Sequence, residues 1–166
     1  MQRKLGKATD QRMALLKNQV SAFLWYGRLE TTFARAKEVQ KLAEQYITMA
    51  VRTYTDVVKV EKERIVDGKT VKVEVVNDGK DKLAVRRTLM AELNDLQEVP
   101  EFKEKKRDFE RRTAGINHPL IEKIFNEYAP KYAQKAADGA KGGYTAIYKL
   151  GPRKGDAAEM AVIQLL

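Results

Sequence analysis

The side chains best suited to chemistry in this 166-residue chain are the lysines and arginines of its first third. An ammonium group binds phosphate as a point charge, and a guanidinium adds a planar fork that takes two phosphate oxygens. Several of them on one surface would attract a polyanion, an anionic membrane surface or an acidic partner. The candidate binding residues are Arg3, Lys4, Lys7, Arg12, Lys17, Arg28, Arg35, Lys37 and Lys41.

The excess positive charge is unevenly distributed along the chain. Lys and Arg outnumber Asp and Glu by 32 to 23, which gives a net charge of +9. Residues 1–55 carry 10 basic and 4 acidic side chains, residues 56–116 carry 15 and 14, and residues 117–166 carry 7 and 5. A segment of high but balanced charge is typical of a solvated surface. The first 55 residues are therefore the better candidates for a phosphate-binding face.

Two short segments near the end of the chain could also contact a nucleic acid. The glycines of Gly142-Gly143-Tyr144-Thr145 would let the backbone approach phosphates, and Tyr144 could stack on a base. The pattern alone favours the alternative, a turn into a strand with the tyrosine in the core. Arg153-Lys154-Gly155-Asp156 is either a basic hairpin tip or a turn in which Asp156 bonds its own backbone.

Catalytic, metal and cofactor chemistry find little support in the residue types. The only histidine, His118, precedes a proline at a predicted helix start, and the only serine, Ser21, lies within a predicted helix. No phosphate-binding glycine loop or metal-ligand spacing occurs, and there is no cysteine. We expect no catalytic residue, metal, cofactor or small-molecule substrate.

The sequence also bears on location. No stretch approaches the roughly 20 apolar residues that span a bilayer, so we expect no membrane span. The first residues lack the apolar run of a secretory signal. A cytoplasmic protein is the default expectation.

Hydrophobic spacing places the N-terminal basic residues on an arm and two helices. Residues 1–8 form a short basic arm. Thr9 is the expected cap of the first helix, and apolar residues then recur every three or four positions to about Trp25. Gly27 should end that helix, and Thr31 or Thr32 should cap a second one. Its predicted buried residues are Ala36, Val39, Leu42, Ala43, Tyr46, Ile47 and Ala50.

The middle of the chain predicts a β-hairpin followed by charged helices. β-Branched runs at 57–66 and 71–76 flank an Asp67-Gly68 turn. Helical spacing returns over 82–96, Pro100 should break it, and 101–114 is a highly charged stretch that we expect to be helical.

The last third predicts a helix opened by Asn117 and Pro119, a short helix from Pro130, and two strands at 144–150 and 159–165. The inward side chains of the first helix should be Leu120, Ile121, Ile124, Phe125 and Tyr128. The predicted class is α+β: helices packed on a small antiparallel sheet, with a basic N-terminal arm and an inserted β-hairpin extension.

Three blocks of this sequence carry a pattern more specific than charge or periodicity. The first is Arg3-Lys4-Leu5-Gly6-Lys7 with Gln11-Arg12-Met13-Ala14-Leu15-Leu16-Lys17-Asn18. The second is Leu29-Glu30-Thr31-Thr32 with Arg35-Ala36-Lys37-Glu38 and Ile47-Thr48. The third is Gly142-Gly143-Tyr144-Thr145 with Arg153-Lys154-Gly155-Asp156-Ala157-Ala158 and Met160-Ala161-Val162-Ile163. In their order and spacing these blocks resemble the family of bacterial large-subunit ribosomal protein number seventeen.

The resemblance implies a structural protein of the large ribosomal subunit that binds ribosomal RNA near the peptide exit side and catalyses nothing. Residues 1–55 and 117–166 would form the RNA-binding core, with 56–116 an inserted extension toward adjacent RNA or a neighbouring ribosomal protein. Carried over by position, the implied RNA contacts are Arg3, Lys4, Lys7, Arg12, Lys17, Thr31, Thr32, Arg35, Lys37, the turn 142–145 and Arg153; Arg28 and Lys154 join them as basic neighbours.

The sequence departs from the family pattern at several positions. Gln11 stands where the family usually has histidine, Ala146 where it has arginine, and Gln164 where glutamate is common. The alternative function is a ribosome-associated or protein-interaction factor that binds RNA transiently. A nucleic-acid-processing enzyme ranks third, because no catalytic constellation supports it.

Overall fold

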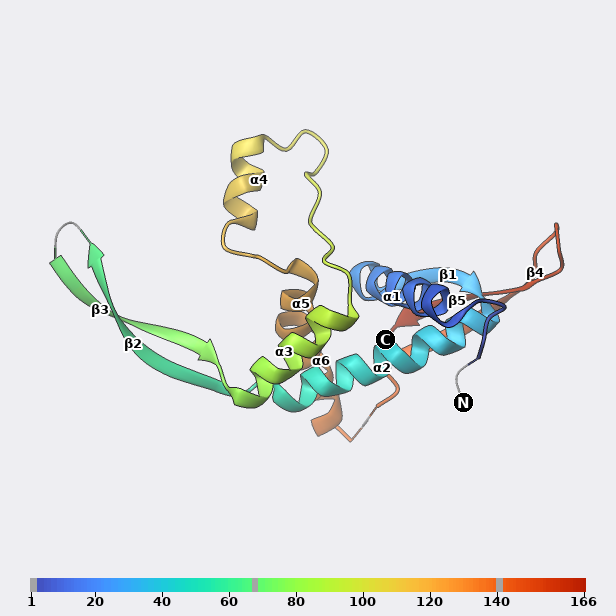
Figure 1. The fold of residues 1–166 in the computed structure, drawn as a ribbon, viewed down its shortest axis with the longest axis horizontal. Coiled ribbons are helices and arrows are strands. Elements are labelled where there is room, and N and C mark those ends of the chain that lie inside the picture. Colours follow the sequence, from blue (N-terminus) through green and yellow to red (C-terminus); the bar gives the residue numbers. More distant parts are fainter. Residues whose placement is uncertain (1–2, 67–68, 140–141) are drawn as a thin grey trace.

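The computed structural model describes residues 3–66, 69–139 and 142–166 and confirms the α+β class (Figure 1). The predicted Asp67-Gly68 turn and the first two residues of the predicted arm lie outside the described residues. In chain order the elements are α1 (Thr9–Tyr26), β1 (Arg28–Thr32), α2 (Phe33–Thr53), β2 (Val57–Val66), β3 (Lys69–Asp78), α3 (Lys80–Glu92), α4 (Lys106–Thr113), α5 (Pro119–Lys123), the π-helical turn η1 (Ile124–Tyr128), α6 (Ala129–Ala137), β4 (Thr145–Pro152) and β5 (Glu159–Leu165). None of the described helices is both long and apolar enough to cross a membrane.

The main sheet has three antiparallel strands in the order β1-β5-β4, and the sequence predicted only β4 and β5. β1 pairs with the central strand β5 from Arg28 opposite Gln164 to Thr32 opposite Met160. Its five residues are too few to show an alternating pattern. Strand β1 therefore depends on its distant partner, and α2 packs against all three strands of this sheet.

The predicted end of α1 is confirmed, whereas the threonines predicted to cap α1 and α2 make no capping bond. Gly27 ends α1 in the left-handed conformation (φ +74°), and its N–H donates to the Phe23 carbonyl over 2.8 Å. The predicted cap Thr9 is instead the first helical residue, after Ala8. Thr32 precedes α2 as predicted, but its hydroxyl makes no capping bond.

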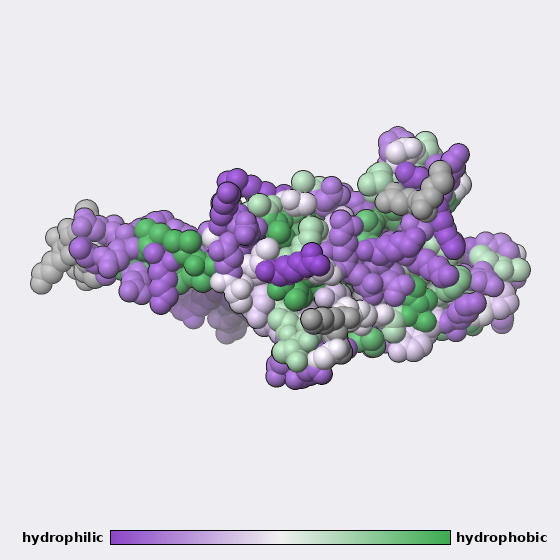
Figure 2. Space-filling model, turned by 90° about the horizontal axis from the view of Figure 1, so that it is seen from below, coloured by the Kyte–Doolittle hydropathy of each residue, from purple (hydrophilic) through white to green (hydrophobic). Residues whose placement is uncertain are grey.

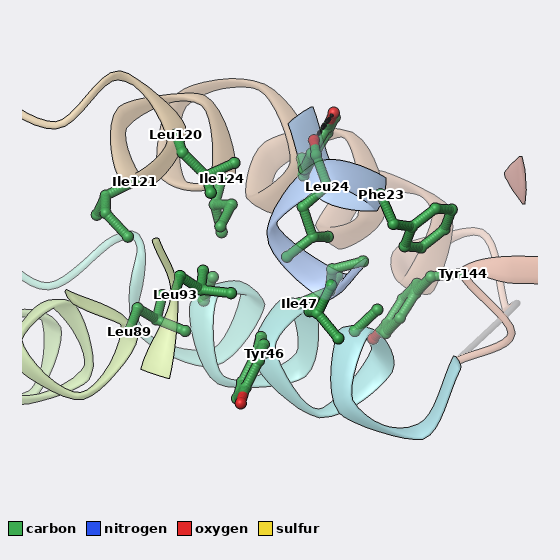
Figure 3. Close-up of a cluster of buried hydrophobic side chains, with 14 of the residues drawn as sticks. Phe23, Leu24, Tyr46, Ile47, Leu89, Leu93, Leu120, Ile121, Ile124 and Tyr144 are labelled. Atoms are coloured by element: carbon green, nitrogen blue, oxygen red, sulfur yellow. Dashed lines mark hydrogen bonds between the residues drawn. The ribbon is translucent and has the colours of Figure 1, made fainter. Parts of the chain in front are cut away.

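The core lies between α2 and the other helices, and most of its residues were predicted. All the predicted inward residues of α2 are buried except Leu42, which packs on the core partly exposed. The five inward residues predicted for the helix after Pro119 are all buried, spread over α5 and η1. Figure 3 shows Leu120, Ile121 and Ile124 facing Leu89 and Leu93 at one end of this core, and Phe23, Ile47 and Tyr144 at the other.

Buried tyrosines close the core with hydrogen bonds. The Tyr128 hydroxyl donates to the Leu24 carbonyl over 2.7 Å, and the Tyr132 ring lies 4.8 Å from that of Tyr144. Burial raises the pKa of Tyr128 to about 12, because the phenolate would lose its water. The Tyr128 phenol therefore remains a neutral donor at any physiological pH.

Helix α3 belongs to the core, although the sequence placed it in the extension that ends at residue 116. Leu89 and Leu93 are buried in the main cluster. The helix ends at Glu92, before Pro100, because Leu93 adopts extended backbone and the Asn94 N–H donates to the buried Ser21 hydroxyl over 2.9 Å. What projects from the body is the β2–β3 hairpin and, separately, the segment that carries α4 (Figure 1).

The predicted helix 101–114 is present only as α4. A charged cluster holds this segment together: Arg112 pairs with Glu98 and Glu104. No side chain of α4 is buried, which explains its short length, because most helical stability in proteins comes from packing an apolar face.

The hairpin joins the body through a polar network. Asp78, the last residue of β3, binds Lys82 at 3.0 Å and Arg86 at 2.5 Å, and Arg86 also binds Glu122 of α5 at 2.5 Å. Although burial opposes it, these bonds lower the pKa of the Asp78 carboxyl and keep it ionised. The network ties the direction of the hairpin to α3 and α5.

Asp56 and Gly79 complete this joint. The Asp56 carboxylate accepts from the backbone N–H groups of Asp81 (2.9 Å) and Lys82 (3.3 Å), so this residue, which immediately precedes β2, caps α3. A Cβ on Gly79 would lie 2.0 Å from that carboxylate, so the close approach requires glycine there.

We predict that Gly79→Ala destabilises the protein by about 1 kcal/mol, the usual value of a lost helix cap, because the methyl group displaces the Asp56 carboxylate. Asp56→Ala should cost the same, and the double variant should be no worse than either single one. Urea unfolding measures all three. Gly155→Ala is the control, because a Cβ there meets nothing within 4 Å; additive losses would show that Gly79 acts through another contact.

Candidate nucleic-acid interface

The arm and the first half of α2 meet at one end of the molecule. The Arg3 guanidinium Nε lies 3.8 Å from Oε1 of Glu38, and the Lys41 ammonium lies 3.5 Å from the same oxygen. The side chain of Glu38 is only 3% exposed, while those of Arg3 and Lys41 are 47% and 65% exposed. One buried carboxylate therefore holds two cations at the surface.

Strand β4 brings a further lysine to this end. Lys37 and Lys149 both lie over the ring of Phe33, with their ammonium groups 4.7 Å and 4.6 Å from its centroid. Such cation–π contacts hold a charge in place without neutralising it. The sequence analysis did not single out Lys149. The feature that could have identified it is a charged residue within the predicted strand 144–150, which lies at the edge of the sheet.

We call Arg3, Lys37, Lys41 and Lys149 the basic end. The first turn of α2 lies here and has no acidic side chain. The partial positive charge of a helix N-terminus is therefore left unbalanced by the helix itself. In Figure 1 this end, with the arm, the start of α2 and the β4–β5 tip, lies opposite the β2–β3 hairpin.

Glu38 was missed as a buried residue, because a glutamate beside basic residues on a helix normally lies in solvent. Its Oε1 has no hydrogen-bond partner among the described residues. Burying a carboxylate is costly unless cations lie beside it. Glu38 therefore depends on Arg3 and Lys41, and the arm depends on Glu38.

The β4–β5 tip has features of both predicted alternatives, the basic hairpin tip and the turn held by Asp156. Arg153 and Lys154 are exposed, as a basic tip requires. The Arg153 fork binds Asp156 at 2.9 and 2.6 Å, and Asp156 also accepts from the Ala158 N–H over 3.2 Å, as in the predicted turn. The bonds from Arg153 and then from Ala158 lower the pKa of Asp156 to about 2. The positive charge of Arg153 is thus balanced by Asp156, and Lys154 is the cation of the tip that is more available to a partner.

Three predicted contact residues have buried side chains that serve the fold. Thr31 accepts from the Gln19 amide over 3.1 Å. Tyr144 lies in the core, as the turn-into-strand interpretation requires, and Thr145 donates to Glu44 over 2.8 Å. Only the neighbouring Gly142 and Gly143 of this turn are exposed, both at positive φ.

The remaining predicted residues are more scattered. Lys4, Lys7 and Arg28 are exposed, and Thr32, Arg35 and Arg12 are partly buried. Lys17 donates to the Ala91 carbonyl over 2.8 Å and so ties α1 to α3. The Arg12 Nε has no partner within the described part of the chain. The structure thus gathers some of the predicted residues at the basic end and spreads the others along α1 and the turn between α6 and β4.

Metal binding has no candidate in the described residues, where no three His, Asp or Glu side chains come together in a group that could hold an ion. His118 instead places its Nδ1 3.2 Å from a carboxylate oxygen of Asp95.

The fold and this surface define an elongated α+β protein with gathered basic side chains at one end and a projecting hairpin at the other. The family model described as Ribosomal protein L17 matches residues 15–166. The chain belongs to the ribosomal protein L17 family, which confirms the resemblance drawn from its sequence blocks.

Similar proteins match along nearly the whole chain. It is 41% identical to the large ribosomal subunit protein bL17 of Ruminiclostridium cellulolyticum, 39% to that of Lachnospira eligens and 36% to that of Acetivibrio thermocellus. Each alignment covers 99% of this chain and 98% of the relative. The matched ranges therefore span residues 56–116 as well as the three blocks.

We predict that Glu38→Gln releases the arm, because the neutral amide no longer attracts Arg3 and Lys41. Limited trypsin digestion should then cleave after Arg3, Lys4 and Lys7 faster than in the unchanged protein, since exposed, unanchored termini are cut first. Glu30→Gln, an exposed change on β1, is the matched control. Equal cleavage rates in the two variants would show that the apolar contact of Leu5 with the core holds the arm instead.

Proposed function

We propose that this protein is a structural constituent of the large ribosomal subunit that binds large-subunit ribosomal RNA near the peptide exit side. The observation that carries the proposal is the basic end, in a member of the ribosomal protein L17 family: three separate segments bring exposed cations to one surface. The relatives are named as large ribosomal subunit proteins, which supports the same assembly here.

Residues 1–55 and 117–166 carry the RNA-binding surface in this proposal. Phosphates bind the exposed cations of the arm, α2, β4 and the β4–β5 tip. The backbone at Gly142 and Gly143 admits a phosphate closely, because these two residues have no side chain in the way. Thr31, Tyr144 and Thr145 act indirectly by fixing the strands and helix from which the contacts project. Bound ribosomal RNA and neighbouring ribosomal proteins are the partners, and the large subunit is the location.

The rival function is a ribosome-associated factor that binds transiently. Sedimentation of the tagged full chain from cell extract on a high-salt gradient separates the two functions. A resident protein stays stoichiometric with the large subunit through the wash. Recovery at the top of the gradient, or binding that salt strips away, would make it a factor.

We predict that RNA binding by the free protein depends steeply on salt, and less so once the basic end is reduced. For large-subunit ribosomal RNA, Lys37→Ala combined with Lys149→Ala should flatten the slope of log K against log salt by about 0.7–0.9 per lost phosphate contact. Filter binding from low to moderate salt measures this slope.

Lys106→Ala is the control for that experiment, because Lys106 is also exposed but lies on α4 and pairs with Glu110 at 3.8 Å. A slope that falls as much for the control as for the double variant would mean that the whole surface, and not the basic end, attracts the RNA.

A further inference from the structure

The β2–β3 hairpin has one apolar and one charged face. Residues opposite one another in an antiparallel pair share a face, and Val60 pairs with Val75 while Lys62 pairs with Val73. The face so defined carries Val58, Val60, Val73 and Val75, which we call the valine face, together with Lys62 and Asn77. The opposite face carries Lys59, Glu61, Glu63, Lys72 and Glu74, with Val57 and Val76 near its base.

The valine face is partly open to solvent. Val58 and Val60 are 50% and 38% exposed, although β-branched apolar residues favour burial, while Val73 and Val75 are half-buried. The hairpin projects away from the body (Figure 1), and apolar surface runs along it in the space-filling view (Figure 2). A two-stranded hairpin is at best marginally stable alone in water, and a contiguous exposed apolar patch usually marks an interaction site.

The charge of the hairpin selects the kind of partner. Strands β2 and β3 carry five basic and four acidic side chains, and Lys72 lies 3.9 Å from Glu61 across the charged face. Asp78 is held by Lys82 and Arg86 at the base. A phosphate backbone gains little from such a balanced surface, because RNA affinity comes largely from excess cations. Over residues 58–62 and 73–77, where its side chains are described, the valine face has Lys62 as its one charged residue. Valines in such a setting match the aliphatic surface of a folded protein.

The joint at the base prepares the hairpin for docking. Lys82, Arg86 and Asp78 have side chains only 12%, 18% and 19% exposed, and they connect the hairpin to α3 and, through Glu122, to α5. A hairpin whose direction is already fixed loses less conformational entropy on binding. This stiffness suits a contact with a partner held at one place, as within a large assembly.

We propose that the valine face docks on an aliphatic patch of a neighbouring protein of the large ribosomal subunit. The inference rests on the proposed function, because residence in the subunit supplies the fixed neighbour. The basic end then binds RNA while the hairpin, at the opposite end, binds protein.

Site-directed photo-crosslinking tests the contact in assembled subunits. A benzoylphenylalanine replaces Val60 in the tagged full chain, and large subunits are purified through a high-salt gradient and irradiated. A cross-link to one large-subunit protein, identified by mass spectrometry and resistant to ribonuclease, is the expected result. The control places the probe at Val76, which is 59% exposed on the other face and should not link to that protein. A cross-link to RNA, no cross-link, or equal cross-links from both positions would overturn the docking face.

A competition experiment covers the case in which the bulky probe disturbs the hairpin. Val60→Glu and Val76→Glu add the same charge to opposite faces, and circular dichroism of each isolated chain checks its fold. Co-expressed with the unchanged chain, Val60→Glu should occupy about tenfold fewer subunits, since a charge replaces a buried valine at the contact. Val76→Glu should compete almost equally. Equal occupancy by the two variants contradicts the inference, whereas loss of the unchanged chain from the subunit in the same gradient would refute the proposed function itself.

Discussion

The apolar face of α2 is the surface on which the rest of this protein is assembled. One side of the helix is buried from Ala36 to Ala50, and it contacts every strand of the main sheet as well as α1, α3, η1 and α6. Its 21 residues extend for about 30 Å at the usual rise per residue. The helix begins at the basic end and leads directly into the hairpin, so its length sets the distance between the two surfaces. Any change that weakened its buried face would disturb the geometry of both.

Much of this architecture follows from local sequence patterns. The period of α1 and α2, the stop at Gly27 and the inward residues after Pro119 are properties of neighbouring residues, and the sequence predicted them. Strand β1, the burial of Glu38 and the place of α3 in the core depend on residues far away in the chain: β5, Arg3 and the α5–η1 segment. Only tertiary contacts create these features, so local periodicity contains no sign of them. The basic surface was likewise predicted in residue type, while its gathering through Glu38 and Phe33 was not.

Counting charges along a sequence also overstates how many are available to a partner. In the middle of the chain Arg86 is shared between Asp78 and Glu122, and Arg112 between Glu98 and Glu104. Burial opposes the charge of Arg86, yet its two carboxylate partners raise its pKa above the ordinary value. At the basic end the ratio of carboxylates to cations is reversed, because the single carboxylate of Glu38 lies beside both Arg3 and Lys41. The net charges of the segments therefore understate how differently the two ends of the molecule present themselves to an anion.

The strand order has a consequence for how the chain matures during its synthesis. β5 lies between β1 and β4, and it follows every other described element in the sequence. β1 must therefore wait while about 130 further residues are polymerised before its hydrogen-bonding partner exists. Until then α1 and α2 can pack on each other and on the helices between them and β5, but the β1 edge stays open to misassociation. Closure of the sheet is therefore a late step, and it is slow because it pairs residues far apart in the sequence. A newly made chain should reach its binding-competent form only in this final step.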